Sequence, residues 1–196
     1  RDQLYGGPFT GKKWMYYVGE ENSTTHATDR RSVNNNFRLL KFSSVILWLA
    51  ECEAELGSLD KAQEYTNMIR ERAQKSASQD ATVNTKVGLY PAGRFTSKGA
   101  AFAINAVHME QRLEFAMEGH RFFDLVRWGI AEKVLNDYVK AESVSGKDNT
   151  GRAITKRSYL VGKTFLPKHN LYPIPADEIL NSQKEGKTVL TQNPGY

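Results

Sequence analysis

The stretch that decides the fold is Arg112–Gly129, which reads RLEFAMEGHRFFDLVRWG. It holds four aromatic residues, two glycines and seven charged or titratable residues within eighteen positions, unlike an ordinary surface helix. We expect a helix over residues 99–118 to lead into it and another over residues 120–128 to follow the break at Gly119. Apolar residues at steps of four and three predict the buried stripe of the first helix: Phe102, Ala106, Met109, Leu113 and Ala116.

The charges of this stretch predict a compact ion-pair network. Glu110, Glu114 and Glu118 follow one another at i, i+4 and repel each other unless cations lie nearby. The arginines and the aspartate that surround the Gly119 break provide opposite charges at short spacing. The predicted network has seven members: Arg112, Glu114, Glu118, His120, Arg121, Asp124 and Arg127.

Two interpretations of the network compete. In the first, Glu114 and Glu118 are a general acid and base, with His120 as proton shuttle or metal ligand. In the second, the network is half-buried and fixes how two helices cross. We favour the structural interpretation because perturbed carboxylates also arise in structural networks, and His120 has no partner at metal-ligand spacing. We therefore assign no catalytic residue, no metal and no cofactor.

Composition narrows the classes of protein. The 196 residues, 40% of them hydrophobic, suit one globular domain. The net charge of +5 comes from isolated basic pairs among acids, so we expect no nucleic-acid partner. The longest apolar run, Val45–Ala50, is far shorter than the ~20 residues of a membrane-spanning helix.

The single cysteine, Cys52, is expected inside a helix as a buried apolar group. The first residue is Arg1, which indicates a processed or truncated chain whose targeting signal cannot be read.

A helical hairpin is predicted over residues 37–75. After an extended entry, Ser43 or Ser44 is expected to cap a helix that ends at Leu56, with Gly57 in the left-handed conformation. The predicted buried stripe of this helix consists of Val45, Leu49, Cys52 and Leu56. Ser58 is expected to cap the second helix, over residues 59–75. That helix is predicted to bury Leu59, Ala62, Tyr65, Ile69 and Ala73.

The hairpin is similar to a tetratricopeptide unit, because large and small residues alternate as such helices require for close approach. No second copy follows at a period of ~34 residues, and a single unit is not stable alone. The hairpin is therefore expected to dock on repeats from a missing N-terminal part, to pack on the helices of residues 102–128, or to do both.

Aromatic residues in two loop-rich segments, residues 1–36 and 76–98, are candidates for ligand contact. The rings either anchor their own loops or stack on a sugar or peptide, since aromatic faces pack on the C–H faces of sugar rings. For residues 76–98, an insertion without function is the favoured alternative. The candidate residues are Trp14, Tyr16, Tyr17, Tyr90 and Phe95, with Asn22, Asn34 and Arg94 as hydrogen-bonding neighbours. A short strand is also possible over residues 14–18.

The remaining chain is predicted to be one further helix and then mostly irregular. The helix should run from residue 130 to about residue 141. With the helices expected over residues 99–118 and 120–128, it completes a helical region over residues 99–142. An exposed loop over residues 143–157 and a short strand over residues 159–165 should follow. Pro173 and Pro175 then indicate an extended tail to residue 196, with a turn at Pro194.

Four blocks of the sequence resemble the SusD/RagB family: the central stretch, two blocks of the tail, and the helical hairpin. The central stretch fits the family pattern R-x-E-[LF]-A-x-E-G-H-R-[YF]-x-D-L-x-R-[WT]-G at Arg112, Glu114, Phe115, Ala116, Glu118, Gly119, His120, Arg121, Phe122, Asp124, Leu125, Arg127, Trp128 and Gly129. The tail fits L-x-P-I-P-x-x-E-[IL] followed by L-x-Q-N-P-G-Y, at residues 171–179 and 190–196. The hairpin ends with the matching IRERA, residues 69–73. With the hairpin itself, the resemblance covers residues 37–196.

The resemblance implies a mainly α fold of tetratricopeptide-like hairpins with long irregular loops and an extended C-terminal tail. Family members are lipid-anchored proteins on the outer surface of the Gram-negative outer membrane, and they are not enzymes. They form the lid of a SusC-like TonB-dependent barrel transporter over a captured glycan or peptide.

By this resemblance the chain would be a C-terminal portion that pairs with an N-terminal half, and the lipidated cysteine would lie upstream of Arg1. No binding residue carries over by motif, because the matching blocks belong to the scaffold. Two other classes stay open: a cytoplasmic tetratricopeptide-like adaptor that binds protein tails, and a hydrolase that uses Glu114 and Glu118.

Overall fold

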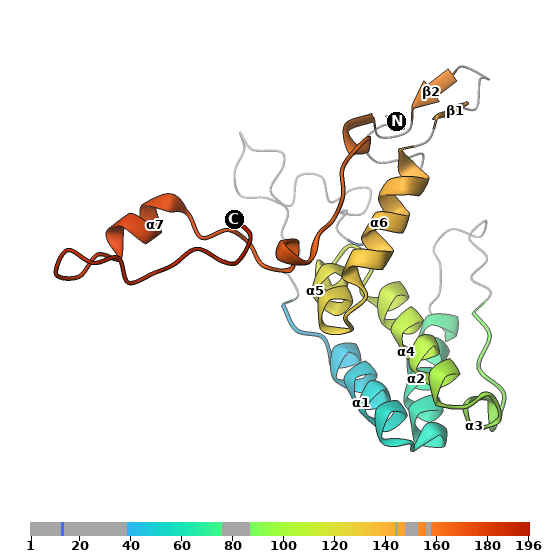
Figure 1. Ribbon diagram of the computed structural model, residues 1–196. Coiled ribbons are helices and arrows are strands. Elements are labelled where there is room, and N and C mark those ends of the chain that lie inside the picture. The colour runs from blue at the N-terminus through green and yellow to red at the C-terminus, as the bar shows by residue number, and fades with distance from the viewer. Residues whose placement is uncertain (1–12, 14–38, 76–86, 144, 148–152, 156–157) are drawn as a thin grey trace, which may run out of the picture. The chain divides into compact units, whose positions relative to one another are not determined.

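The computed structural model describes residue 13 and residues 39–75, 87–143, 145–147, 153–155 and 158–196. It contains two compact units, one from residues 11–121 and one built mainly from residues 122–196. The described chain is mainly α, as the sequence predicts (Figure 1). Its α-helices are α1 (Phe42–Leu56), α2 (Leu59–Lys75), α3 (Arg94–Lys98), α4 (Ala100–Glu114), α5 (His120–Arg127), α6 (Ala131–Glu142) and α7 (Ala176–Asn181). None of the described helices is long and apolar enough to cross a membrane.

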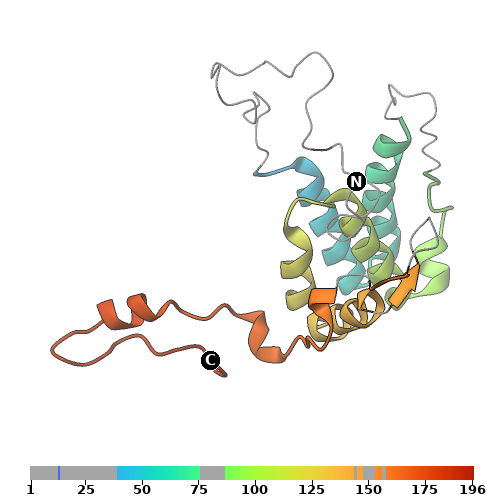
Figure 2. The ribbon, with the colours of Figure 1, turned by 90° about the horizontal axis from the view of Figure 1, so that it is seen from above.

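Helices α1, α2 and α4 form the packed centre of the first unit, and Figure 2 shows them side by side. Small side chains line their contacts, and Ala50, Ala54, Ala62 and Ala103 are each at most 1% exposed. Such residues let helix backbones approach closely, as in tetratricopeptide repeats. The predicted hairpin is confirmed, with Gly57 in the left-handed conformation at φ 89°. It packs on α4, one of the two alternatives that the sequence left open.

The buried face of α1 is not the one that periodicity predicted. Val45, Leu49, Cys52 and Leu56 are exposed, while Leu47, Ala50 and Ala54 are buried. The predicted cap is also wrong, because the helix begins at Phe42 and both Ser43 and Ser44 lie buried in its first turn. Lys41 is the N-cap residue, and its carbonyl accepts the N–H of Ser44 at 3.0 Å.

Helix α4 ends four residues earlier than predicted. Phe115 is its C-cap, and the chain then turns through Met117, with φ 65°, and Gly119, with φ 83°. The predicted stripe also fails toward its end, since Met109 and Leu113 are 48% and 59% exposed. The buried face instead carries Ala103, Ala106, Val107, Glu110 and Gln111.

Residues 87–98, predicted to be loop, pack against α2 and include the short helix α3. Side-chain amides of α2 hold this segment in place. Asn67 accepts the N–H of Tyr90 at 2.9 Å and donates to its carbonyl at 2.9 Å. Gln63 accepts the N–H of Phe95 and donates to the carbonyl of Pro91, both at 2.9 Å. Each amide thus serves the backbone as a neighbouring strand would.

In the second unit, α5 and α6 agree with the predicted helices. Strands β1 (Ser145–Lys147) and β2 (Ala153–Thr155) form an antiparallel pair inside the predicted loop. The strand predicted over residues 159–165 is absent: a 3₁₀ turn covers Ser158–Leu160, and Gly162 turns the chain with φ 73°. Asn136 on α6 binds both the N–H and the carbonyl of Phe165, at 2.8 and 2.9 Å, so these groups need no strand partner.

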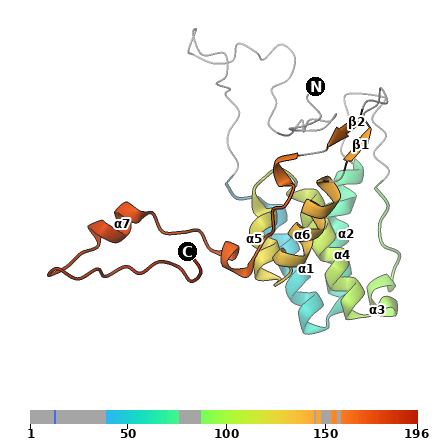
Figure 3. The ribbon, with the colours of Figure 1, turned by 45° about the horizontal axis from the view of Figure 1, so that its top comes forward.

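Residues 166–196, here called the C-terminal segment, double back on themselves (Figure 3). The segment begins with a second 3₁₀ turn, Pro167–Asn170, and it contains α7, where a fully extended path was predicted. Pro175 directly precedes α7, a position that a proline tolerates. Gln192 binds both the N–H and the carbonyl of Ile174, at 2.7 and 2.8 Å. Lys168 Nζ donates to the carbonyl of Gly195 at 2.8 Å, and the Tyr196 hydroxyl donates to the carbonyl of Leu171 at 3.0 Å.

Candidate functional site

The carboxylates of Glu114 and Glu118 lie among three cations. Glu114 receives Arg72 Nη2 at 2.6 Å and Lys41 Nζ at 3.0 Å. Glu118 receives Lys41 Nζ at 2.9 Å and Lys13 Nζ at 2.5 Å. The side chains of Glu114 and Glu118 are only 10% and 9% exposed. We call these five residues the carboxylate cluster.

Helix ends bring the carboxylate cluster together. Glu114 is the last residue of α4, Lys41 directly precedes α1, and Arg72 lies in the last turn of α2. Lys13 also donates to the carbonyl oxygens of Glu114 at 2.7 Å and Ala116 at 3.2 Å. These carbonyls lie at the C-terminal end of α4, where the last carbonyl oxygens of a helix have no backbone N–H partner within the helix. A cation there also interacts favourably with the negative end of the helix dipole.

The cluster holds both carboxylates in their charged form. Burial alone raises the pKa of Glu114, but hydrogen bonds from Arg72 and Lys41 outweigh it and leave the pKa below its ordinary value. For Glu118, burial likewise raises the pKa, and hydrogen bonds from Lys13 and Lys41 bring it below the ordinary value. A general acid needs a carboxyl group that keeps its proton near neutral pH. Neither group suits that role.

A second ion pair lies one turn earlier on α4. Arg70 Nη1 contacts Glu110 Oε2 at 2.7 Å, and the Glu110 side chain is only 6% exposed. Desolvation raises the pKa of Glu110 above its ordinary value, although Arg70 acts in the opposite direction. Arg70 also donates to the carbonyl of Gly88 at 2.7 Å and lies 4.8 Å from the ring of Tyr90. This pair therefore ties α2 and α4 to the segment before α3.

Buried polar groups also link α1 to α4. Gln111 donates to Glu51 Oε2 at 2.8 Å, and His108 Nε2 lies 3.5 Å from Glu51 Oε1. Among the described residues, no group of three or more histidine, cysteine, aspartate or glutamate side chains is arranged to hold a metal ion. The contacts of Glu51 with Gln111 and His108 connect α1 to α4.

The structure brings only two of the seven predicted network members into the carboxylate cluster, Glu114 and Glu118. The ring of His120 packs on Phe115 with centroids 4.9 Å apart. Asp124 and Arg127 make their own contact within α5, at 3.0 Å. Of the remaining two members, Arg112 is exposed on α4. Arg121 is half-buried on α5.

Sequence reasoning missed the cations of the cluster, namely Lys13, Lys41 and Arg72. Lys13 and Lys41 lie in segments interpreted as loop or extended entry, far along the chain from Glu114. Arg72 stood in the IRERA motif, where it could have been recognised as a cation near the end of an amphipathic helix. Three carboxylates at i, i+4 signalled that cations were required, but not where they would come from.

The predicted ligand-contact residues have different outcomes. Trp14, Tyr16 and Tyr17 lie outside the described residues, as do Asn22 and Asn34. Phe95 is fully buried, so ligand contact by its ring is wrong: the ring packs on Tyr90 and Phe102, with centroids 5.0 and 5.8 Å away. Tyr90 is half-buried against this core, and Arg94 lies over the ring of Phe102 at 5.6 Å.

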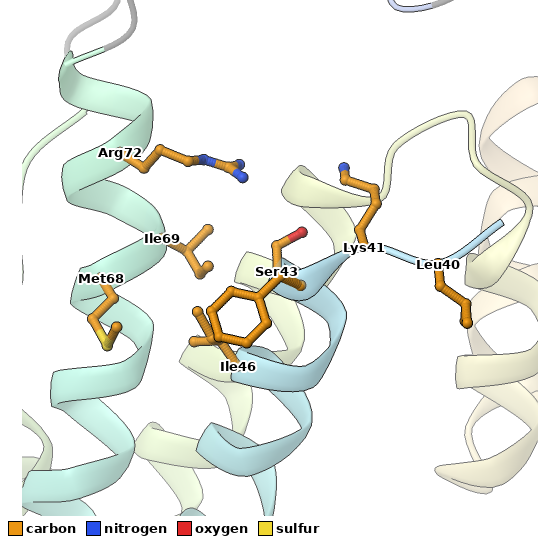
Figure 4. Close-up of a pocket in the computed structure, with 8 residues that line it drawn as sticks. Leu40, Lys41, Ser43, Ile46, Met68, Ile69 and Arg72 are labelled. Atoms are coloured by element: carbon orange, nitrogen blue, oxygen red, sulfur yellow. The ribbon is translucent and has the colours of Figure 1, made fainter. Parts of the chain in front are cut away.

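An open groove of about 380 Å³ adjoins the carboxylate cluster (Figure 4). Figure 4 shows Ile46 of α1 and Ile69 and Met68 of α2 at its base, with Lys41 and Arg72 reaching over them. Both cations already neutralise Glu114. The groove is lined by Leu40, Lys41, Phe42, Ser43, Ile46, Met68, Ile69 and Arg72.

Small residues between α1, α2 and α4, together with ion pairs that lock the helix ends, define a helical-repeat scaffold. A family model described as the SusD family matches residues 4–196. The chain therefore belongs to the SusD family.

Two individual proteins are similar to this chain. The SusD-like protein P25 of Formosa agariphila is 28% identical over 172 residues, which cover 88% of this chain and 26% of the relative. The solved structure of BT4246 superposes with a TM-score of 0.55 at 22% identity, covering 86% of this chain and 25% of that one. The structural similarity to BT4246 supports the mainly α SusD-like fold. The chain spans about a quarter of the length of each protein. Members of the SusD family are in general nutrient-binding outer-membrane proteins rather than enzymes.

Proposed function

We propose that this chain is the C-terminal scaffold of a nutrient-binding lipoprotein on the outer surface of the outer membrane. In this role the protein is the lid of a SusC-like TonB-dependent barrel transporter and retains a captured glycan. The observation that carries the proposal is the family match over residues 4–196. The carboxylate cluster is consistent with it, because cations hold Glu114 and Glu118 in the charged form and connect the ends of α1, α2 and α4.

A glycan is the favoured ligand, and aromatic side chains are its proposed contacts. Trp14, Tyr16 and Tyr17 offer flat faces for the C–H faces of sugar rings, with Tyr90 as a further candidate. The proposal for Tyr90 concerns only the exposed part of a ring that also packs in the core. A peptide ligand is the alternative outcome of the binding experiment.

Calorimetric titration of the protein with a panel of oligosaccharides and peptides tests the proposal. We expect Trp14→Ala to weaken glycan binding by about fivefold or more with little change in Tm, since stacking contacts contribute on the order of 1 kcal/mol or more. Trp48→Ala is the matched control, because Trp48 lies on α1 and is 45% exposed. It should leave the affinity unchanged. A Trp14→Ala protein with a large loss of Tm and normal affinity would place Trp14 in the scaffold instead.

Location and partner need separate experiments. Whole cells treated with protease should lose this protein while the outer membrane stays intact, and a fatty-acid label should be incorporated upstream of Arg1. A tagged protein extracted in mild detergent should co-purify with a TonB-dependent transporter. Recovery from the cytoplasm without a lipid label would support the adaptor class and exclude this proposal.

A further inference from the structure

Helix α6 and residues 160–169 line an open groove that has no part in the function proposed above. Its volume is about 310 Å³. The aliphatic part of its lining comes from Leu135 and Val139 on α6 and from Leu160 in the 3₁₀ turn, and all three side chains are half-buried. We call it the α6 groove. Its size lies at the lower end of the range for small-molecule sites, so it suits a ligand of one ring or one short chain.

Aromatic rings complete the apolar lining of the α6 groove. Tyr138, Phe165 and His169 line it, and the rings of Phe165 and His169 meet edge to face with centroids 5.4 Å apart. Asn136 on α6 binds the N–H and the carbonyl of Phe165, at 2.8 and 2.9 Å, and so fixes this part of the lining. A groove that is held in place before binding reduces the entropy cost of taking up a ligand.

The polar side chains of the groove are mainly hydrogen-bond donors. Lys163 and Thr164 line it together with His169, and there is no carboxylate or side-chain amide among the described residues of the lining. His169 Nδ1 accepts the N–H of Leu166 at 2.9 Å, so the hydrogen of the imidazole lies on Nε2 and makes that atom a donor. An ammonium group and an imidazole N–H in one apolar groove are suited to an anion.

The same lining disfavours a neutral sugar. Sugar hydroxyls donate as well as accept, and carboxylates and amides are the side chains best able to accept several such bonds. Hydroxyl groups left unpaired in an apolar groove cost free energy. A carboxylate needs only donors, and its two oxygens match two donor groups. The ligand that fits is therefore an apolar body with one carboxylate.

We propose that the α6 groove binds a small amphipathic carboxylate, namely an arylalkanoate with one ring and a short chain. The ring packs against Tyr138, Val139 and Phe165. The carboxylate accepts hydrogen bonds from Lys163 Nζ and His169 Nε2. This site uses none of the residues proposed above for glycan contact, so its test is independent of the test of that function.

Titration of this chain with 3-phenylpropionate, followed by nuclear magnetic resonance, tests the proposal. We expect a Kd of about 1 mM, which is usual for a ligand of this size. The largest shifts should occur at residues 135–139 and 163–169. 3-Phenylpropanol lacks the carboxylate and propionate lacks the ring. Each should bind about tenfold more weakly or less well still, since each lacks one half of the recognition.

Substitutions of the cation show whether the carboxylate is recognised in this groove. Lys163→Met should weaken binding of 3-phenylpropionate about fivefold, because it removes one charged donor at an exposed position, and Lys163→Arg should restore it. Lys140→Met is the matched control, since Lys140 is exposed on α6 and does not line the groove. This variant loses the same charge and should keep its affinity within about twofold.

A substitution that fills the groove tests the place of binding. Val139→Trp should abolish the shifts, because the larger side chain occupies the space of the ligand ring. Circular dichroism shows whether this variant folds, and the Lys163 variants decide the matter if it does not.

Several results would overturn the proposal. One is the absence of binding by 3-phenylpropionate up to about 20 mM, well above the expected Kd. Equal binding of 3-phenylpropanol would show an apolar site without recognition of the carboxylate. Equal weakening by Lys163→Met and Lys140→Met would assign the effect to net charge. Unchanged binding in a folded Val139→Trp protein would place the ligand elsewhere.

Discussion

The three-helix centre of the first unit and the C-terminal segment hold their backbones by different means. In α1, α2 and α4, side chains such as Leu47 and Val107 are fully buried, and carboxylates are paired with cations inside the packing. In the C-terminal segment no residue is buried, and side chains such as Gln192 and Lys168 bind backbone groups directly. The first arrangement depends on exclusion of water, and the second on hydrogen-bond geometry. We therefore expect the two regions to respond differently to substitution.

The largest effect is expected for Leu47→Ala. Leu47 is fully buried in the helical core, so truncation should leave a cavity and lower the free energy of unfolding by about 2–5 kcal/mol. Urea denaturation followed by circular dichroism measures this. Leu180→Ala is the control on α7, where Leu180 is 60% exposed, and it should change stability by less than about 0.5 kcal/mol. Equal losses for both variants would remove the contrast between the two regions.

A smaller loss is expected for Glu114→Gln in the carboxylate cluster. The amide keeps the shape but leaves Arg72 and Lys41 without their shared anion. Because Arg72 is itself 55% exposed, we expect a loss of about 1–3 kcal/mol rather than the cost of a fully buried charge. Thermal melting measures the loss. Asp137→Asn, which removes an exposed ion pair with Lys133, should have no measurable effect.

The pH dependence of stability should show two opposing contributions. The pKa values of Glu114 and Glu118 lie below the ordinary 4.5, so their contribution is complete above that pH and is lost as the pH falls through the folded values. Glu110 has a raised pKa, so its contribution is complete below 4.5 and is lost as the pH rises through the folded value. Urea midpoints between pH 7 and pH 3 should therefore fall more steeply in Glu110→Gln. A shallower fall in that variant would contradict the assignment.

The smallest global effect is expected for Gln192→Ala in the C-terminal segment. Loss of its two hydrogen bonds to Ile174 should leave the urea midpoint of the helical core unchanged. Hydrogen exchange at the Ile174 amide should nevertheless accelerate by about fivefold, as expected for one part-buried hydrogen bond of about 1 kcal/mol. Gln183→Ala in the same segment is the control. If the helical core also lost stability, the C-terminal segment would be part of the same cooperative unit.

The positions of the helices could be predicted from the sequence better than the faces they bury. The bounds of α2, α5 and α6 follow from local signals such as Gly57 and Gly129, which act within a few residues. The buried face of α1 could not be chosen this way, because the helix has two apolar stripes and the larger residues lie on the outer one. The polar residue Glu51 lies on the inner side of α1, where it accepts a hydrogen bond from Gln111 of α4.

The sequence predicted that the carboxylates would be paired with cations, but it did not predict which cations these would be. The i, i+4 spacing of Glu110, Glu114 and Glu118 was enough to require cations, and each of these carboxylates has one. Lys13 and Lys41 could not be chosen, since their distances to the carboxylates depend on tertiary structure. Phe95 was assigned to a ligand because loop aromatics often bind ligands, whereas here Gln63 fixes its backbone and the ring enters the core.

The side-chain amides that bridge backbone groups have a consequence for mutational tolerance. Leu47 in the core can be exchanged for methionine or isoleucine at a cost below about 1.5 kcal/mol. Gln63, Asn67, Asn136 and Gln192 each donate and accept at once, and a carboxylate of the same shape cannot donate. Deamidation of Asn67 or Asn136 during ageing would therefore break one bond of each bridge without any change in volume. Comparisons with distant relatives should accordingly give these four amides more weight than the apolar positions around them.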